Sequence, residues 1–293
     1  MRVCLEDQSK TILRKENDME KNKLSQLKEH AANIRLGILE EIHAASSGHP
    51  GGSLSIADIL SYLYFSEMRV DPQNPDDPGR DRLVLSKGHT APALYAALAE
   101  KGFIPKEDLK GFRNINSYLQ GHPDMKHTPG CDMTTGSLGL GVSAACGMAL
   151  SGKIRKQDYR VYAIVGDGES EEGQVWESAM FAAHYKLDNL CYILDLTGLH
   201  IDGPIAEVMN PNPHDEKFRA FGWNVVEADA HDFDSLDRAF AAARACKGRP
   251  TIIIAHSVKG KGVSFMENQV GWHGAAPNDE QYAAAVAEIR ATM

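Results

Sequence analysis

One aspartate between two glycines is the feature of this sequence best suited to chemistry. Gly166-Asp167-Gly168 directly follows an apolar run at residues 159–165, which is typical of a buried strand, and a helical pattern begins a few residues later. The glycines let the backbone approach a ligand closely, and the Asp167 carboxylate is a hard oxygen ligand for Mg²⁺ or Ca²⁺. Free N–H groups at the start of the following helix would favour a diphosphate.

A second run of strand type, at residues 190–194, leads into Thr197-Gly198-Leu199. It would bring a hydroxyl and a backbone carbonyl to the same edge of a sheet, as further oxygen ligands. Gly-Asp-Gly alone is better explained as an ordinary strand-to-helix turn. Together with the second strand, it predicts a metal ion bound beside a diphosphate.

Four histidines fall in glycine-bounded loops, namely His49, His89, His122 and His273. A single histidine in a loop is more often a solvated turn residue than a catalyst. Four of them at one predicted sheet edge indicate a site, because imidazole titrates near neutral pH and can donate or accept a proton.

Charged side chains near these loops allow two interpretations. Glu169, Glu171 and Glu172 crowd the start of a helix, where carboxylates compensate the helix dipole. For Glu169 and Glu171 this structural role is as well supported as a functional one. The run Lys259-Gly260-Lys261-Gly262 is either a solvated basic turn or an anchor for a phosphate or the tail of a cofactor.

The elements that must position these residues alternate along the chain. Apolar residues spaced by three and four predict a helix that ends near Ser46 (Leu27, Ala31, Ile34, Ile38 and Ile42). Similar reasoning predicts helices at 55–65, 91–101, 171–185 and 235–246, a short apolar run at 82–85, and strands at 159–165, 190–194 and 251–256. Such alternation is typical of an α/β fold with a parallel β-sheet flanked by helices on both faces. Ligands then bind beyond the carboxyl ends of the strands.

We expect one domain at residues 23–293, because no repeat or linker divides it. Residues 1–22 are highly charged, and we expect them to be a disordered extension or the product of a start upstream of Met19. They are too charged for a secretory signal.

Composition excludes several classes of protein. The 293 residues carry a net charge of -9, which argues against nucleic acid as a partner. No apolar run approaches the ~20 residues that span a bilayer. The five cysteines lie far apart, without a zinc-type or disulfide-type pattern, so reduced thiols in the cytoplasm are expected.

Several motifs together carry a family resemblance. In order and spacing, the chain from about residue 24 to 290 resembles transketolase in SSGHPGG, LSKGHTAPALYAAL, GHPD, TTGSLGLG, GDGESEEGQVWE and WHGAAP. The resemblance implies the diphosphate-binding (PP) domain of a thiamine-diphosphate-dependent enzyme, with thiamine diphosphate and Mg²⁺ (or Ca²⁺) as cofactors.

The resemblance also implies roles for single residues. His49 and His122 would contact hydroxyls of the donor sugar, and His89 and His273 would lie near the diphosphate and the reacting carbon. Glu172 would act at a subunit interface that links active sites, with Glu177 beside it. The metal ligands would be Asp167, Thr197 and Leu199. Cofactor contacts would further come from Gly136, Ser137, Leu138, Gly166, Gly168 and Glu169.

Two positions depart from the family pattern. Thr197 stands where the family has an asparagine whose amide oxygen helps to bind the metal, and His200 stands where glutamine is usual. The threonine hydroxyl is a shorter and weaker ligand, so the departure bears on metal affinity rather than on the fold. A water or the hydroxyl itself would complete the ligand shell, since Mg²⁺ commonly keeps several waters.

The resemblance covers only half of a transketolase. The pyrimidine-binding domain, whose glutamate activates the cofactor, would follow the region seen here. Either a second gene encodes it or this chain is a domain of a longer protein, and we favour the two-gene interpretation. The expected partner is a C-terminal transketolase subunit, in a heterotetramer with a homodimer-like core.

The expected reaction is the transfer of a two-carbon ketol unit from a ketose phosphate to an aldose phosphate. Other sugar phosphates, such as apulose 4-phosphate, are alternative substrates. Deoxyxylulose-phosphate synthases and 2-oxoacid dehydrogenase α-subunits share the GDG motif but fit the remaining motifs less well. A non-catalytic paralogue is favoured only by Thr197, and the four loop histidines argue against it.

Overall fold

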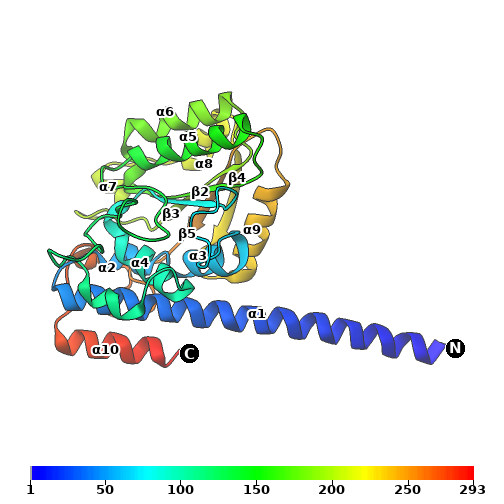
Figure 1. The fold of residues 1–293 in the computed structure, drawn as a ribbon, viewed down its shortest axis with the longest axis horizontal. Helices are drawn as coiled ribbons and strands as arrows, with labels where there is room; N and C mark the ends of the chain where they lie inside the picture. Colours follow the sequence, from blue (N-terminus) through cyan, green and yellow to red (C-terminus); the bar gives the residue numbers. More distant parts are fainter. Residues whose placement is uncertain (1) are drawn as a thin grey trace.

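Five parallel strands form one sheet at the centre of the domain (Figure 1). The computed structural model describes the backbone of residues 2–293 and the side chains of residues 21–293. The strands lie side by side in the order β1-β2-β3-β5-β4. Their bounds are β1 (Arg82–Leu85), β2 (Val161–Gly166), β3 (Leu190–Leu196), β4 (Asn224–Asp229) and β5 (Thr251–His256). The predicted parallel sheet is confirmed.

Helices cover both faces of the sheet, as predicted (Figure 1). One face packs on the helices α1 (Arg2–Ala45), α3 (Ala57–Tyr62), α4 (Ala91–Lys101) and α9 (Phe233–Ala245). The other face packs on α5 (Leu140–Ile154), α6 (Gly173–His184) and α8 (His214–Ala220). Shorter helices are α2 (Pro50–Leu54) and α7 (Ile205–Val208), and α10 (Asp279–Arg290) is the last element.

Alternate residues of the central strands enter different cores. In β3, Ile193 joins the core that contains α1, whereas Tyr192 and Leu194 join the core under α5 and α6. This alternation follows from the two-residue period of a strand. Because both faces are covered, the β3 strand is apolar almost throughout, which is why its sequence reads as a continuous buried run.

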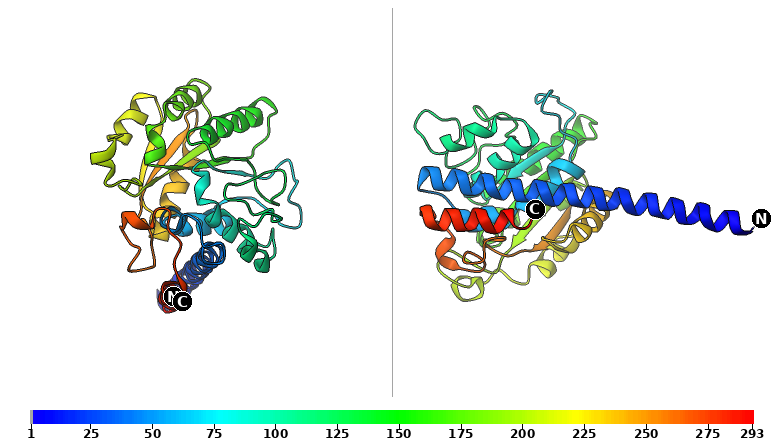
Figure 2. Two further views of the ribbon diagram at one scale, coloured as in Figure 1. Left: turned by 90° about the vertical axis from the view of Figure 1, so that its left-hand side faces the viewer. Right: turned by 90° about the horizontal axis from the view of Figure 1, so that it is seen from below.

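The helix α1 crosses the bottom of the domain, and α10 lies alongside it (Figure 2). The helix α1 ends at Ala45, one residue from the predicted end, and the apolar residues predicted for its inner face are buried. Close packing on α4 depends on Gly37, since a methyl there would stand 2.8 Å from Ala96 Cβ. Residue 1 and the side chains of residues 2–20 lie outside the described part, so the predicted domain start near residue 23 stays a prediction.

Several predicted bounds need correction. The expected helix at 55–65 is the short helix α3, followed by the π-helical turn η1 (Leu63–Glu67). The short helix α2 precedes α3 and was not predicted; it begins at Pro50, because proline is well suited to a first helical turn. The strand expected at 159–165 runs from Val161 to Gly166.

Several elements were not predicted from the sequence, namely the short helices α2, α7 and α8, the strand β4 and the helix α5. The edge strand β4 is only partly buried and includes Glu227 and Asp229, so it lacks an apolar run. The helix α5 contains three interior glycines among small residues, which hid its helical character. In the described part of the chain, no helix has the length and apolar character needed to cross a membrane.

Candidate active site

A cavity of about 280 Å³ opens where β2 and β3 end. The turns after these strands line it, with contributions from the turn after β1 and from the loop after β5. Residues that the sequence placed in the site make up most of this lining, namely His89, Leu138, Gly166, Asp167, Gly168, Glu169, Thr197, Leu199 and His273. The strand-end location is the one expected for a parallel sheet.

The Asp167 carboxylate is buried among the strand-end turns. Its Oδ2 accepts hydrogen bonds from the N–H groups of Thr197 at 2.8 Å and Gly198 at 2.7 Å, and its Oδ1 accepts one from Gly168 at 2.9 Å. Burial, followed by the nearby Asp195 carboxylate, raises the pKa of Asp167 above its ordinary value despite these donors. A bound cation would therefore favour the ionised form.

Three oxygens of the predicted metal site lie together. The Thr197 hydroxyl is 3.0 Å from Asp167 Oδ2 and 3.4 Å from the carbonyl oxygen of Leu199. Oxygen ligands of this kind suit Mg²⁺ or Ca²⁺, with water filling the remaining positions. Among the described residues no group of three or more His, Cys, Asp or Glu is arranged to hold a metal ion. The predicted site would not form such a group, because Asp167 is the one carboxylate among its three ligands.

Lys87 is a buried cation of the cavity that the sequence analysis did not single out. Its Nζ donates to Asp195 Oδ2 at 2.6 Å and to the carbonyl oxygen of Gly52 at 2.8 Å. Burial alone would raise the pKa of Asp195, but the Lys87 ammonium holds it below its ordinary value. The position of Lys87 just after β1 is the one sequence signal that pointed to it.

A second ammonium group, from Lys259, enters the same cavity. Its Nζ donates to the carbonyl oxygen of Leu199 at 2.9 Å. Burial lowers the pKa of Lys259 to about 8, although Asp167 favours the charged form. Because Lys259 is buried at the cavity, its loop is better interpreted as an anchor for a phosphate than as a solvated basic turn.

Three of the four predicted histidines lie together, and two of them, His89 and His273, line the cavity. Ring centroids are 5.1 Å apart for His49 and His89, 5.6 Å for His49 and His273, and 5.5 Å for His89 and His273. Burial, followed by neighbouring positive charge, lowers the pKa of His49, that of His89 to about 2 and that of His273 to about 3. All three imidazoles are therefore neutral near pH 7. Within the described chain, Nδ1 of His49 and of His273 has no hydrogen-bond partner, which leaves both atoms for a ligand.

The fourth histidine, His122, lies against the glycine-rich loop at residues 135–139. A methyl group at Gly136 would stand 3.2 Å from His122 Cγ, so glycine allows the close approach. Leu138 lines the main cavity, whereas Gly136 and Ser137 line a separate pocket. The loop thus contacts both His122 and the cavity.

Glu169 does not lie at an exposed helix terminus, which corrects the dipole interpretation for this residue. It is 3% exposed, and its carboxylate accepts hydrogen bonds from Ser86 Oγ at 2.5 Å, Gly139 N at 2.9 Å and Gly166 N at 3.0 Å. Burial raises its pKa. Glu169 therefore fastens the ends of β1 and β2 to the glycine-rich loop, and its direct contact with a cofactor stays a prediction.

The other acidic residues singled out from the sequence do not line the main cavity. Glu172 and Glu177 are exposed near the start of α6, so their expected interface role stays a prediction. Glu171 stands 4.0 Å from His200 Nε2. The His200 ring packs over Gly168, where a methyl group would approach its Cδ2 to 3.0 Å.

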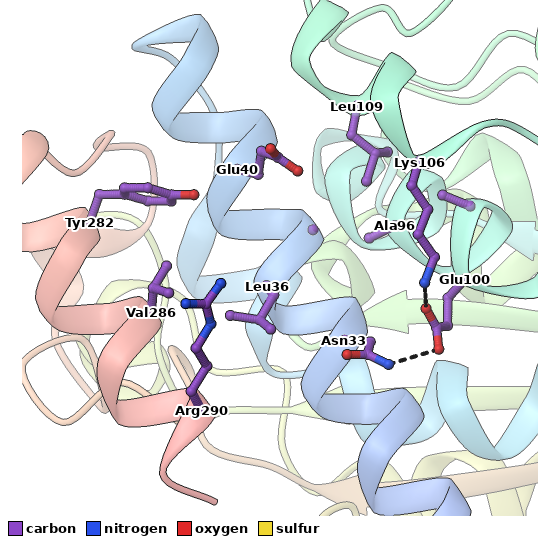
Figure 3. Close-up of a pocket in the computed structure, with 12 residues that line it drawn as sticks. Asn33, Leu36, Glu40, Ala96, Glu100, Lys106, Leu109, Tyr282, Val286 and Arg290 are labelled. Atoms are coloured by element: carbon purple, nitrogen blue, oxygen red, sulfur yellow. Dashed lines mark hydrogen bonds and ion pairs between the residues drawn. The ribbon is translucent and has the colours of Figure 1, made fainter. Parts of the chain in front are cut away.

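A second cavity, of about 220 Å³, lies between α1, α4 and α10, away from the strand ends (Figure 3). Leu36 and Ala96 line its apolar part, and Asn33 and Lys106 both donate to the Glu100 carboxylate at its rim. None of the predicted site residues lines this cavity. We assign it to the packing of the three helices.

Known proteins similar to this chain share most of its length. The family model described as transketolase, thiamine diphosphate binding domain, matches residues 27–290. The chain is 48% identical over 262 residues to 6-deoxy-6-sulfo-D-fructose transketolase subunit SqwG of Clostridium sp. (strain MSTE9), covering 89% of this chain and 95% of that protein. It is 42% identical over 255 residues to an apulose-4-phosphate transketolase subunit of Phocaeicola vulgatus, covering 87% and 90%.

Full-length transketolases match over part of their own length. Human transketolase is 44% identical over 256 residues, which cover 87% of this chain and 40% of the human protein. The crystal structure of Campylobacter jejuni transketolase superposes with a TM-score of 0.85 and 33% identity, covering 91% of this chain and 43% of that one. The similarity therefore extends to the three-dimensional fold.

Proposed function

We propose a ketol-transfer function from the premise that this chain belongs to the transketolase family, through its thiamine diphosphate binding domain. In this proposal, the chain is one half of a two-subunit enzyme that transfers a two-carbon ketol unit from a ketose phosphate to an aldose phosphate. The observation that carries the proposal is the strand-end cavity, where the Asp167 carboxylate and the Lys87 and Lys259 ammonium groups lie together.

The groups in the cavity fit a diphosphate and a divalent cation. Oxygens of Asp167, Thr197 and Leu199 would hold Mg²⁺ or Ca²⁺. Lys87 and Lys259 would face the diphosphate, whose charge the two ammonium groups and the metal would balance. Burying the Lys259 ammonium group is unfavourable, as its lowered pKa indicates. An anionic ligand such as a diphosphate would offset this unfavourable burial.

Thiamine diphosphate supplies a ring that stabilises the carbanion formed when a C–C bond beside a carbonyl breaks. The chain's own contribution is a set of neutral imidazoles. His49 and His122 would contact hydroxyls of the donor sugar, and His89 and His273 would lie near the diphosphate and the reacting carbon. A neutral imidazole carries one N–H donor and one lone pair. Such a pair of groups can hold a hydroxyl in place and accept or return its proton.

A second subunit completes the proposed enzyme. The two relatives that this chain covers almost completely are named as transketolase subunits. Large apolar side chains are exposed on and beside α5 and α6, at Leu140, Met180, Phe181 and Tyr185. We propose that this face meets other chains in a heterotetramer, and that Glu172 lies within that contact. A cytoplasmic location belongs to the same proposal.

Three donor sugars are candidate substrates. Xylulose 5-phosphate, with ribose 5-phosphate as acceptor, is the default pair for the family. The 48% identical relative is named for 6-deoxy-6-sulfo-D-fructose, and this favours a sulfonated ketose as the second candidate. Apulose 4-phosphate, in the name of the 42% identical relative, is a third.

The test is reconstitution with the product of an adjacent gene for a pyrimidine-binding transketolase subunit. The mixture, with thiamine diphosphate and Mg²⁺, should release the shortened aldose from one of the three donors, and neither chain should do so alone. Transfer by this chain alone would contradict the two-subunit proposal. Absence of Mg²⁺-dependent cofactor binding to the complex would favour a non-catalytic paralogue.

A further inference from the structure

Arg113 connects the two segments that carry His49 and His122. Its Nη1 donates to Ser47 Oγ at 2.6 Å, two residues before His49. Its guanidinium also lies against Gly121, the residue before His122, because a methyl group at Gly121 would stand 3.0 Å from Arg113 Nε. These segments are distant in sequence, and one side chain contacts both.

The conformation of Arg113 is unfavourable in itself. Its φ is 62°, in the left-handed region that non-glycine residues seldom adopt. Its N–H donates to the carbonyl oxygen of Leu119 at 2.8 Å, and its guanidinium lies 5.3 Å from the ring centroid of Phe112, which fixes the side chain. Within the described chain, the buried Nε has no hydrogen-bond partner. Strain and an unpaired donor together are characteristic of functional sites.

The charge of Arg113 reaches both histidines. Burial, followed by the Arg113 charge, lowers the pKa of His49 and of His122. Further charges of His122 and Lys259 act on His49 in the same direction, while a hydrogen bond to the His89 backbone opposes them. A nearby cation disfavours the imidazolium form, so Arg113 helps to keep both rings neutral.

We infer that Arg113 is a positioning residue of the active site, which braces the segment before His49 against the segment before His122 and so sets the two imidazoles relative to each other. This inference rests on the proposed ketol-transfer function, in which the two rings contact the donor sugar. Arg113 itself acts through the histidines and need not touch the sugar.

The test begins with the full chain alone. The ring C–H signals of His49 and His122 are assigned with H49Q and H122Q, then titrated by NMR in wild type, Arg113→Gln and Arg113→Lys. In Arg113→Gln the pKa of both rings should rise by roughly half a unit or more, because the neighbouring positive charge is gone. Arg113→Lys keeps the charge and should titrate nearly as wild type. Arg238→Gln, which removes an exposed arginine on α9, is the matched control and should change neither ring.

Kinetics of the reconstituted complex then separate position from charge. Loss of the brace should lower kcat/KM roughly tenfold or more in Arg113→Gln, with only partial recovery in Arg113→Lys, because lysine cannot contact both segments. If Arg113→Gln does not fold, Gly121→Ala displaces the guanidinium without removing its charge, and it should lower kcat/KM as well. Unchanged kcat/KM in a folded Arg113→Gln would overturn the inference, and unchanged titration of both rings would show that the Arg113 charge does not act on them. Absence of ketol transfer by wild type would instead remove the proposed function and leave the titration result standing.

Discussion

The Thr197 hydroxyl donates a hydrogen bond to Asp167 Oδ2 at 3.0 Å, so two of the proposed metal ligands are hydrogen-bonded to each other. The same oxygen accepts the N–H groups of Thr197 and Gly198. A cation bound to Asp167 Oδ2 and Thr197 Oγ1 would break the hydrogen bond from the Thr197 hydroxyl. The hydrogen bonds from the N–H groups of Thr197 and Gly198 would stay in place. The side chain at position 197 is therefore where metal affinity is most easily changed.

We expect Thr197→Asn to tighten Mg²⁺-dependent cofactor binding by roughly three- to tenfold. An amide oxygen reaches further than the hydroxyl and is a stronger ligand, and ligand identity and orientation typically change metal affinity on this scale. Titration calorimetry with thiamine diphosphate at fixed Mg²⁺ measures the change. Thr197→Val is the matched control, because it keeps the shape, removes the oxygen and should weaken binding. Equal affinity in all three proteins would show that residue 197 does not face the metal.

Asp167→Asn should abolish Mg²⁺-dependent cofactor binding, because it removes the one charged ligand of the set. It should also change how stability depends on pH in the metal-free chain. The folded-state pKa of Asp167 is raised above the ordinary value of 3.8, so the folded state holds its proton longer than the unfolded state. Wild-type stability should therefore decrease as pH rises from 3.8 through the raised pKa. Urea unfolding across this window checks it, and the variant should lack that part of the decrease.

The strand–helix alternation could be predicted from sequence because central strands and helices have distinct periods. Residues 251–256 and 91–101 form the predicted strand and helix with the same bounds. The strand β4 could not be predicted in this way, since an edge strand with Glu227 exposed to solvent has no apolar run to recognise.

Asp167 and Thr197 could be placed together because parallel strands end at one edge of the sheet. Lys87 could not be assigned, since its role depends on Asp195, which lies near the end of a different strand, and no local pattern links the two residues. Arg113 was missed for a similar reason, because its environment exists only after two distant loops meet. The proposed interface role of Glu172 involves a second chain, so this chain alone does not test it.

Lys87→Met should destabilise the chain by about 3–5 kcal/mol, because it leaves the buried Asp195 carboxylate without its cation. Thermal and urea unfolding measure the loss. The double variant Lys87→Met with Asp195→Asn should recover part of it, since no unpaired charge remains. A cost of the single variant below about 1 kcal/mol would contradict a strong buried pair.

The same pair predicts a sensitivity to acid. The folded-state pKa of Asp195 is lowered below 3.8, so its contribution is fully present above that value and disappears as pH falls through the lowered pKa. Wild type should therefore lose stability more steeply below pH 3.8 than the double variant. Parallel unfolding curves of the two proteins in this range would contradict the assignment.

Cofactor affinity should decrease at alkaline pH because Lys259 loses its proton there. Its pKa in the cofactor-free chain is lowered to about 8, and only the ammonium form attracts a diphosphate. At pH 9 the affinity should be at most about tenfold below that at pH 7, the limit set by the remaining charged fraction. Binding above pH 8 should take up a proton, because a diphosphate stabilises the ammonium form.

Two variants isolate the contribution of Lys259. Lys259→Arg stays charged and should bind with little pH dependence between pH 7 and 9, whereas Lys259→Met should bind weakly throughout that range. Calorimetry in two buffers of different ionisation enthalpy measures both the affinity and the proton uptake. A wild-type pH profile that matches the Lys259→Arg profile would show that Lys259 does not face the diphosphate. In the cofactor-free chain the sign is opposite: the folded-state pKa lies below the ordinary 10.5, so stability should rise as pH increases from 8 to 10.5.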